Sequence, residues 1–187
     1  MTKLLFLDTE TGGLNPDFHS LLSVGLVAWE DFKIIDKKEI LLKEEHFKVN
    51  SSAMEVNGID LEEHKKNAVE YNEGVKLINE FCKNNFEIPP TITLVGHNIN
   101  FDISFLKKLY KNSEIPYEQL FSHRTIDTSS ILKYLYMTGN FDEDISSSDK
   151  AFNYFNIVAS KRHSALSDAV ATTELFEQLL KIYLKKD

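Results

Sequence analysis

The chain has 187 residues, of which 42% are hydrophobic and 27% charged; these values predict one globular domain spanning residues 1–187 and exclude a disordered chain. Its single cysteine, Cys82, cannot build a disulfide framework and favours a reducing compartment. The net charge of −8 argues against tight unaided binding to long duplex nucleic acid, because such binding depends on basic surfaces. An acidic chain is compatible with an enzyme that holds divalent cations and touches only a few terminal nucleotides.

The N-terminal apolar run, residues 4–7, is interrupted by Asp8 and is too short for a signal peptide. No stretch of the sequence approaches the ~20 apolar residues of a membrane span. We therefore expect a cytoplasmic protein with no membrane partner.

The first part of the chain predicts three strands. Residues 3–9 contain four consecutive apolar residues and are followed by turn-forming residues at 12–16. Residues 21–29 and 32–42 predict two further strands, joined by the short link Glu30-Asp31. Three strands with tight connections predict an antiparallel meander.

In the remainder, helical and strand patterns alternate. In chain order we expect a helix over residues 71–82, a strand over 91–96, a helix over 101–110 capped by Asn100, a strand over 123–128, a helix through 131–135, an exposed loop over 138–148 and a packed helix over 165–184. Strands followed by alternating helices and strands predict an α/β fold with a mixed sheet flanked by helices.

The first candidate motif follows the first strand. Side chains alternate along a strand, so Asp8 and Glu10 point to the same side. Two neighbouring carboxylates repel each other unless a cation lies between them, and a hard divalent cation is the natural partner. An isolated Asp-x-Glu is also a common surface pair, so this motif by itself leaves a structural role open.

The second motif lies on the predicted helix over residues 101–110. Asp102 shares a helical face with Phe105, Leu106 and Leu109, which places a carboxylate on the apolar side. An unpaired buried charge is costly, which favours a cation nearby. The alternative is an acid that stabilises the positive N-terminal end of the helix.

The third motif pairs His163 with Asp168. Five residues along one helix would separate these side chains by about 140°. If Ser164 caps the helix, His163 instead lies in the preceding loop and can fold back over Asp168. Asp168 lies in a largely apolar helix, where a buried acid favours a bound cation; a solvated loop histidine is the alternative for His163.

Together and in this order, the three motifs resemble those of the DEDD exonucleases, specifically the histidine-bearing, DnaQ-like branch. The matching patterns are Phe6-x-Asp8-x-Glu10-Thr11, Asn98-x-x-Phe101-Asp102-x-x-Phe105-Leu106 and His163-x-x-x-x-Asp168. Residues 53–59 are similar to a linking segment of that branch, in which a histidine often stands at the place of Asn57, and residues 125–128 resemble the step before the third motif. The resemblance covers nearly the whole chain and implies an RNase H-like fold with a five-stranded mixed sheet.

The resemblance also implies a role for each acidic residue. Asp8, Glu10 and Asp168 would ligate the metal that binds the attacking water, with Asp8 bridging to a second metal. Asp102 would hold the second ion through water, and His163 would act as the general base.

Two Mg²⁺ (or Mn²⁺) ions about 3.5–4 Å apart stabilise the entering and leaving oxygens of a phosphodiester, and four carboxylates match their combined charge. Histidine suits the base because its pKa lies near neutrality.

The same resemblance indicates where the terminal nucleotide binds. The backbone after the first motif, at Thr11, and an apolar side chain, for which we choose Leu14, would contact it. Phe101 and Phe105 are expected in the core. Asn98 either shapes the site or serves as a turn residue at the end of a strand.

We therefore expect a metal-dependent 3′–5′ exonuclease that acts on a single-stranded 3′ end, with DNA favoured over RNA and with a polymerase or other protein as a further partner. The alternatives are an oligoribonuclease-type enzyme that trims RNA, a non-catalytic binding module on the same fold, and a metal phosphoesterase for small nucleotides. The residues do not discriminate between the two sugars.

Overall fold

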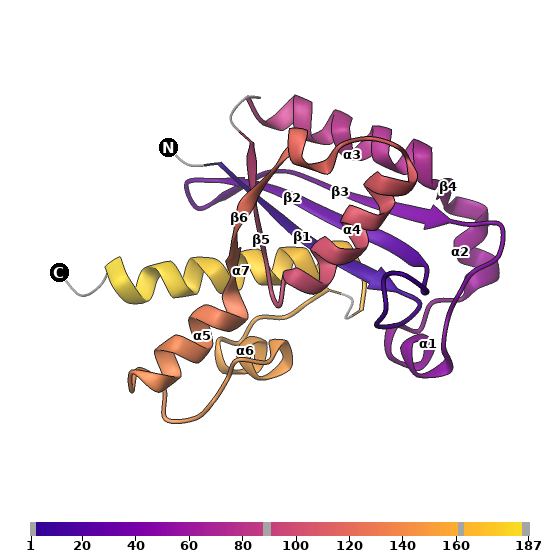
Figure 1. The fold of residues 1–187 in the computed structure, drawn as a ribbon. Coiled ribbons are helices and arrows are strands. Elements are labelled where there is room, and N and C mark those ends of the chain that lie inside the picture. The colour runs from indigo at the N-terminus through magenta and orange to yellow at the C-terminus, as the bar shows by residue number, and fades with distance from the viewer. Residues whose placement is uncertain (1–2, 88–90, 161–162, 185–187) are drawn as a thin grey trace.

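The computed structural model describes residues 3–87, 91–160 and 163–184. Its centre is a six-stranded mixed sheet with the strand order β4-β3-β2-β1-β5-β6 (Figure 1). In chain order the strands are β1 (Leu4–Thr11), β2 (Leu21–Glu30), β3 (Lys33–Lys43), β4 (Val69–Glu70), β5 (Ile92–Gly96) and β6 (Phe121–Asp127).

The predicted antiparallel meander is confirmed, because β2 pairs antiparallel with both β1 and β3. Strand β5 then runs parallel to β1, and β6 runs parallel to β5, which gives the mixed sheet that the sequence predicts. The expected number of five strands is one too few. The extra strand, β4, has only two residues and pairs with the end of β3, and a segment this short carries no alternating pattern.

The hairpin between β2 and β3 turns one residue later than predicted. Its turn residues are Asp31 and Phe32, with φ angles of 50° and 60°. Two successive residues with positive φ form the kind of two-residue turn that matches the twist of a hairpin. Phe32 therefore belongs to the turn rather than to the third strand.

Helices cover both faces of this sheet (Figure 1). They are α1 (Ser51–Asn57), α2 (Leu61–Asn67), α3 (Tyr71–Asn85), α4 (Asn100–Asn112), α5 (Thr128–Met137), α6 (Ser148–Tyr154) and α7 (Ala165–Leu184), with a short 3₁₀ helix at Tyr117–Gln119. The bounds of α7 are those predicted. None of the helices in the described ranges is long and apolar enough to cross a membrane.

Two local predictions are wrong. Asn100 does not cap α4: it is the first helical residue, Ile99 occupies the capping position, and no side chain bonds there. The exposed loop predicted over residues 138–148 ends one residue early, because Ser148 begins α6, and it is not exposed throughout, since Phe141 and Ile145 are buried. Helices α1, α2 and α6 each have seven residues, which is too short for an apolar repeat to identify them.

The alternation of side chains along β1 divides the core. Leu5 and Leu7 pack with residues of α3 and α4, whereas Leu4 and Phe6 pack with Ala169 and other residues of α7. The same alternation continues to the end of β1, so the last side chains of this strand point alternately toward α4 and toward α7.

Candidate active site

The C-terminal end of β1 presents two carboxylates and a hydroxyl. Asp8 and Glu10 lie on the same face of β1 as Phe6, which packs against α7. Thr9 lies on the opposite face with Leu7, which packs toward α4. In the register of the sheet, Asp8 lies opposite Gly25 of β2. Strand β5 ends beside this point at Gly96, so the site lies at the carboxyl end of a parallel strand pair, where ligands of α/β sheets bind.

Asp102 occupies the first turn of α4 and is only 4% exposed. Its Oδ1 accepts a hydrogen bond of 2.7 Å from the Thr9 hydroxyl. The pKa of Asp102 is raised to about 7, mainly by burial and to a smaller extent by the nearby carboxylate of Asp127, while hydrogen bonds from Thr9 oppose the shift. A carboxyl group in this state would ionise fully beside a divalent cation.

The loop before α7 brings His163 back over Asp168. His163 has a φ of 59°, in the left-handed region, and its backbone N–H donates to Oδ2 of Asp168 at 3.1 Å. Asp168 is 8% exposed, and its N–H donates to the carbonyl of Ser164 at 2.9 Å. The fold-back that the sequence requires for this pair is therefore present, and His163 lies outside the helix.

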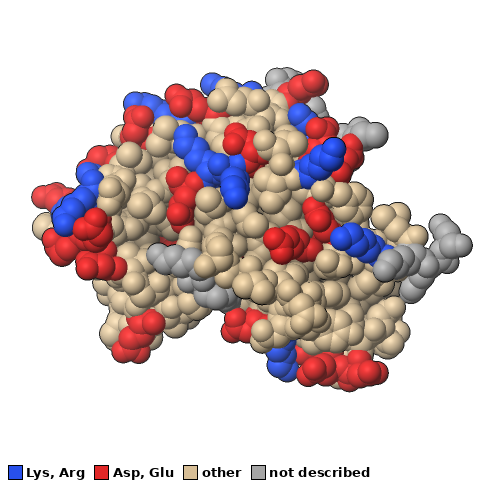
Figure 2. All heavy atoms as spheres, turned by 180° about the vertical axis from the view of Figure 1, so that it is seen from behind, with Lys and Arg blue, Asp and Glu red and all other residues tan. Residues whose placement is uncertain are grey.

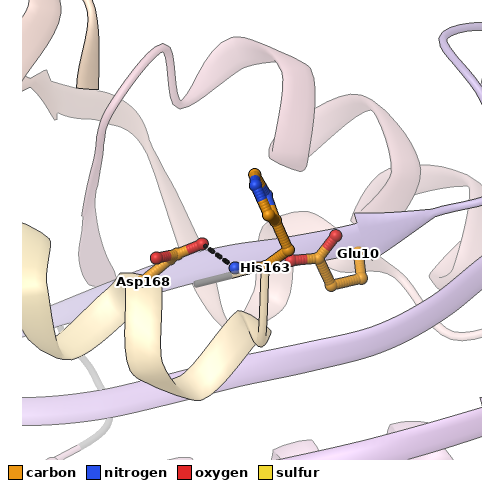
Figure 3. A group of neighbouring side chains, drawn as sticks. All are labelled: Glu10, His163 and Asp168. Carbon is orange, nitrogen blue, oxygen red and sulfur yellow. Dashed lines mark hydrogen bonds between the residues drawn. The ribbon is translucent and has the colours of Figure 1, made fainter. Parts of the chain in front are cut away.

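Glu10 joins this pair from the strand. Ligand atoms of Glu10, His163 and Asp168 all lie within 4.8 Å of one another, and Figure 3 shows the three residues together where the end of β1 meets the start of α7. The carboxylate oxygens suit Mg²⁺ or Mn²⁺, which prefer oxygen ligands.

All five residues predicted to be catalytic line one cavity of about 220 Å³. Its lining is Asp8, Thr9, Glu10, His97, Asn98, Phe101, Asp102, Ser148, Phe152, His163, Asp168 and Thr172. The predicted residue Asn98 thus borders the site, and it also fits the turn interpretation, since its φ is 59° and its N–H donates to Asp127 at 2.8 Å.

Six residues of this lining are not among the predicted site residues: Thr9, His97, Phe101, Ser148, Phe152 and Thr172. His97 follows the end of β5 directly, and that position was the signal that could have identified it. Ser148 and Phe152 belong to the short helix α6, for which the local pattern offers no comparable signal.

A second, more apolar cavity of about 290 Å³ adjoins the first and shares Thr9, Glu10 and Phe101 with it. Its other lining residues are Thr11, Gly13, Leu14, Asn50, Ser52, Ala53, Val56 and Asn57. The Leu14 side chain is 81% exposed and that of Val56 is 60% exposed. The Thr11 hydroxyl donates to the carbonyl of Gly13 at 2.8 Å.

The expectation that both phenylalanines of the second motif are core residues holds only for Phe105. Phe105 is 2% exposed, whereas Phe101 is only partly buried and packs against the edge of the core. Phe101 borders both cavities because it lies in the first turn of α4, at the end of the helix nearest β1.

Comparison with known proteins decides the family. The RNase_T family model, described as "Exonuclease", matches residues 5–176. The chain belongs to this exonuclease family. The resemblance to the DnaQ-like DEDD exonucleases is thereby confirmed.

Curated relatives of this exonuclease chain are much longer proteins. A "DNA polymerase III PolC-type" of Caldanaerobacter subterraneus subsp. tengcongensis is 28% identical over 179 residues, covering 96% of this chain and 12% of that protein. A "3'-5' exonuclease DinG" of Staphylococcus aureus (strain bovine RF122 / ET3-1) is 26% identical over 188 residues, covering 98% of this chain and 19% of that protein.

Solved structures show the same fold. The zinc-bound complex of E. coli ExoI with single-stranded DNA has a TM-score of 0.83 and 17% identity, and the match covers 100% of this chain and 42% of ExoI. E. coli exonuclease I in complex with a dT13 oligonucleotide has a TM-score of 0.81 and 16% identity, with 98% and 43% covered. The predicted RNase H-like α/β fold is confirmed.

Proposed function

We propose that this exonuclease domain, residues 1–187, hydrolyses single-stranded nucleic acid from its 3′ end, releases nucleoside 5′-monophosphates and prefers DNA. The observation that carries the proposal is the convergence of four carboxylates and a histidine on one cavity, next to a second cavity with apolar side chains. These five residues are Asp8, Glu10, Asp102, His163 and Asp168.

The carboxylates suit two divalent cations, Mg²⁺ or Mn²⁺. Asp8, Glu10 and Asp168 would hold one ion and Asp102 would hold the other, with Asp8 between the two. Bound in this way, the ions would lower the pKa of the attacking water and offset the charge that develops on the phosphate. The family is one of divalent-metal-dependent enzymes, and the Glu10, His163 and Asp168 group supports a metal site in this chain.

The proton of the attacking water needs an acceptor, and we assign that role to His163. Its backbone N–H is bound to Asp168, so the residue is anchored through its main chain, and a nitrogen of its ring lies within 4.8 Å of ligand atoms of Glu10 and Asp168. A neutral imidazole can take a proton at physiological pH and return it to solvent.

The second cavity is the proposed site of the terminal nucleoside. Leu14 and Val56 expose apolar side chains there, and a base gains free energy by covering such surface. Phe101 borders both cavities, so a nucleoside placed here would have its 5′ phosphate close to the carboxylates. Asn57, whose side chain donates to the Thr11 carbonyl at 3.2 Å, would hold the backbone of the first motif in place.

The direction and the sugar preference rest on relatives. One relative is named a 3′–5′ exonuclease, and structural neighbours are complexes with single-stranded DNA. The charge distribution supports a short contact with the substrate: on the face seen in Figure 2, basic and acidic side chains are interspersed rather than gathered in one continuous basic stripe. One relative is named a PolC-type DNA polymerase, which supports a polymerase or another protein as a further partner.

The first experiment uses 5′-labelled single-stranded DNA and RNA oligomers of the same sequence, with Mg²⁺, Mn²⁺ or EDTA. We expect a ladder that shortens from the 3′ end, faster for DNA and absent in EDTA. Faster shortening of RNA would reverse the sugar assignment. Intact oligomers with both metals would overturn the proposed activity and favour a binding role on the same fold.

A further inference from the structure

The first turn of α7 rests directly on strand β2 at Gly25. A Cβ atom at this position would lie 2.2 Å from the carbonyl carbon and oxygen of Ala165 and 2.4 Å from the nitrogen of Leu166. These are backbone atoms, so no side-chain rearrangement could relieve the overlap. Glycine at position 25 therefore allows the helix to begin in contact with the sheet.

Gly25 also occupies a particular place in the register. It pairs with Asp8 of β1 on one side and with Glu39 of β3 on the other. These three positions form one row across the sheet, on the face that α7 covers. Because Gly25 has no side chain, the start of α7 lies between the catalytic candidate Asp8 and the carboxylate of Glu39.

Glu39 holds the start of the helix from the outer side. Its Oε1 accepts a hydrogen bond of 3.0 Å from the Ser164 hydroxyl and one of 3.4 Å from the backbone N–H of Leu166. The first amides of a helix lack partners within the helix, and a negative charge near them is favourable. A residue 125 positions away in the sequence thus supplies the cap that a neighbouring side chain would ordinarily provide.

The start of α7, which Glu39 holds, also carries the third motif. Glu39 bonds to Ser164 and Leu166, while Asp168 bonds to the N–H of His163. The two carboxylates therefore hydrogen-bond to the same turn, residues 163–166. Glu39 also lines a cavity of about 360 Å³ together with Glu10 and His163, so it borders the candidate site without being one of its expected ligands.

We propose that Gly25 and Glu39 are positioning residues for hydrolysis. They fix the position of the first turn of α7 on the sheet, so that His163 and Asp168 lie close to Glu10. The inference rests on the proposed exonuclease function. In this arrangement Glu39 acts through hydrogen bonds to the helix start, and Gly25 acts through the absence of a side chain. Neither residue touches the reacting phosphate.

The test compares Glu39→Ala and Glu39→Gln with Glu63→Ala, using steady-state release of nucleotides from a DNA oligomer in Mg²⁺. Glu63 lines the same cavity and pairs with Lys66 rather than with α7, so its removal controls for loss of a nearby charge. We expect kcat to fall about 3- to 10-fold in Glu39→Ala with KM within about twofold, since small displacements of catalytic groups are costly. Glu39→Gln retains an acceptor oxygen and should recover most of kcat, and Glu63→Ala should match the wild type.

Amide hydrogen exchange supplies a readout that does not depend on activity. In Glu39→Ala, exchange should accelerate at residues 163–168 and remain unchanged in β1 and β2. Gly25→Ala should lower kcat more than Glu39→Ala does, and the double variant should lose less than the product of the two effects, because both changes displace the same turn.

The outcomes separate the two proposals. No oligomer shortening by the wild-type protein would refute the exonuclease function itself. An active wild type with a Glu39→Ala variant of equal kcat and equal exchange would overturn the positioning role alone. Equal losses in Glu39→Ala and Glu63→Ala would also overturn it, because they would assign the effect to charge rather than to the helix contact.

Discussion

The hydroxyl of Thr9 donates a 2.7 Å hydrogen bond to the carboxyl of Asp102, which joins β1 to α4 across 93 residues of sequence. Thr9 stands between the two acids of the first motif, and its side chain points to the opposite face of the sheet. Through this bond Thr9 of the first motif holds Asp102, the acid of the second motif. The two motifs are therefore mechanically linked even without an ion between them.

The burial of Asp102 makes this residue a source of pH-dependent stability in the metal-free protein. Burial raises its pKa from 3.8 to about 7, so the folded state favours the protonated form and loses stability as the pH rises from about 4 to about 7. We expect Asp102→Asn to have a free energy of unfolding about 2–4 kcal/mol above the wild type at pH 8, and close to it at pH 4. Urea unfolding in EDTA at both pH values measures this difference; an equal offset at the two values would contradict it.

Asp8→Ala is expected to abolish hydrolysis while leaving the fold intact. In the proposed site Asp8 would help to hold both metal ions, so removal of its carboxylate would leave too few ligands for them. Oligomer shortening should fall by a factor of about 10³ or more, at or beyond the upper end of the loss caused by removing one group that stabilises developing charge. Asp17→Ala, a change of the same kind in the exposed loop after β1, is the control. Full activity in Asp8→Ala would remove the metal-site assignment.

The metal requirement can be tested at Asp168 without disturbing the His163 loop. Asp168→Asn removes a charge but keeps an oxygen that can accept from the His163 N–H, which donates at 3.1 Å in the structure. We expect the Mg²⁺ concentration for half-maximal activity to rise at least tenfold, and the thermal stabilisation that Mg²⁺ gives the wild type to shrink. An unchanged Mg²⁺ titration would exclude Asp168 as a ligand.

The base assignment needs a substitution that tolerates the backbone of His163. Its φ of 59° is accessible to asparagine more readily than to alanine. We expect His163→Asn to lower kcat about 10²- to 10⁴-fold, the usual effect of a lost general base, with unfolding temperature close to that of the wild type. A loss of less than about tenfold would assign proton removal to another group.

The assignment of Leu14 as a side chain that contacts the terminal nucleotide predicts an effect on binding. Leu14 is 81% exposed and borders the apolar cavity. Truncation in Leu14→Ala removes surface that a base would cover, so KM for a DNA oligomer should rise about fivefold or more while kcat changes little. Val158→Ala is the matched control, since Val158 is 85% exposed and lies outside the lining of both cavities. Equal KM values in the two variants would contradict a contact between Leu14 and the terminal nucleotide.

Local sequence was sufficient for the main elements. The apolar run of β1, the meander formed with β2 and β3, and the limits of α7 follow from side-chain periodicity and from turn-forming residues. Strand alternation places Asp8 and Glu10 on the same side of β1, and this alternation depends only on the local sequence. The family could also be predicted, because its motifs are short and keep their order along the chain.

Tertiary structure decided what depends on contacts between distant segments. Three contacts join residues that are far apart in sequence: the Thr9–Asp102 bond, the cap that Glu39 provides for α7, and the close approach of α7 to Gly25. No local pattern encodes them. The same holds for β4, which exists only through its pairing with β3, and for the position of Phe152 in the lining of the site. Sequence periodicity determines which face a side chain takes, whereas packing of the helices on the sheet determines what that face meets.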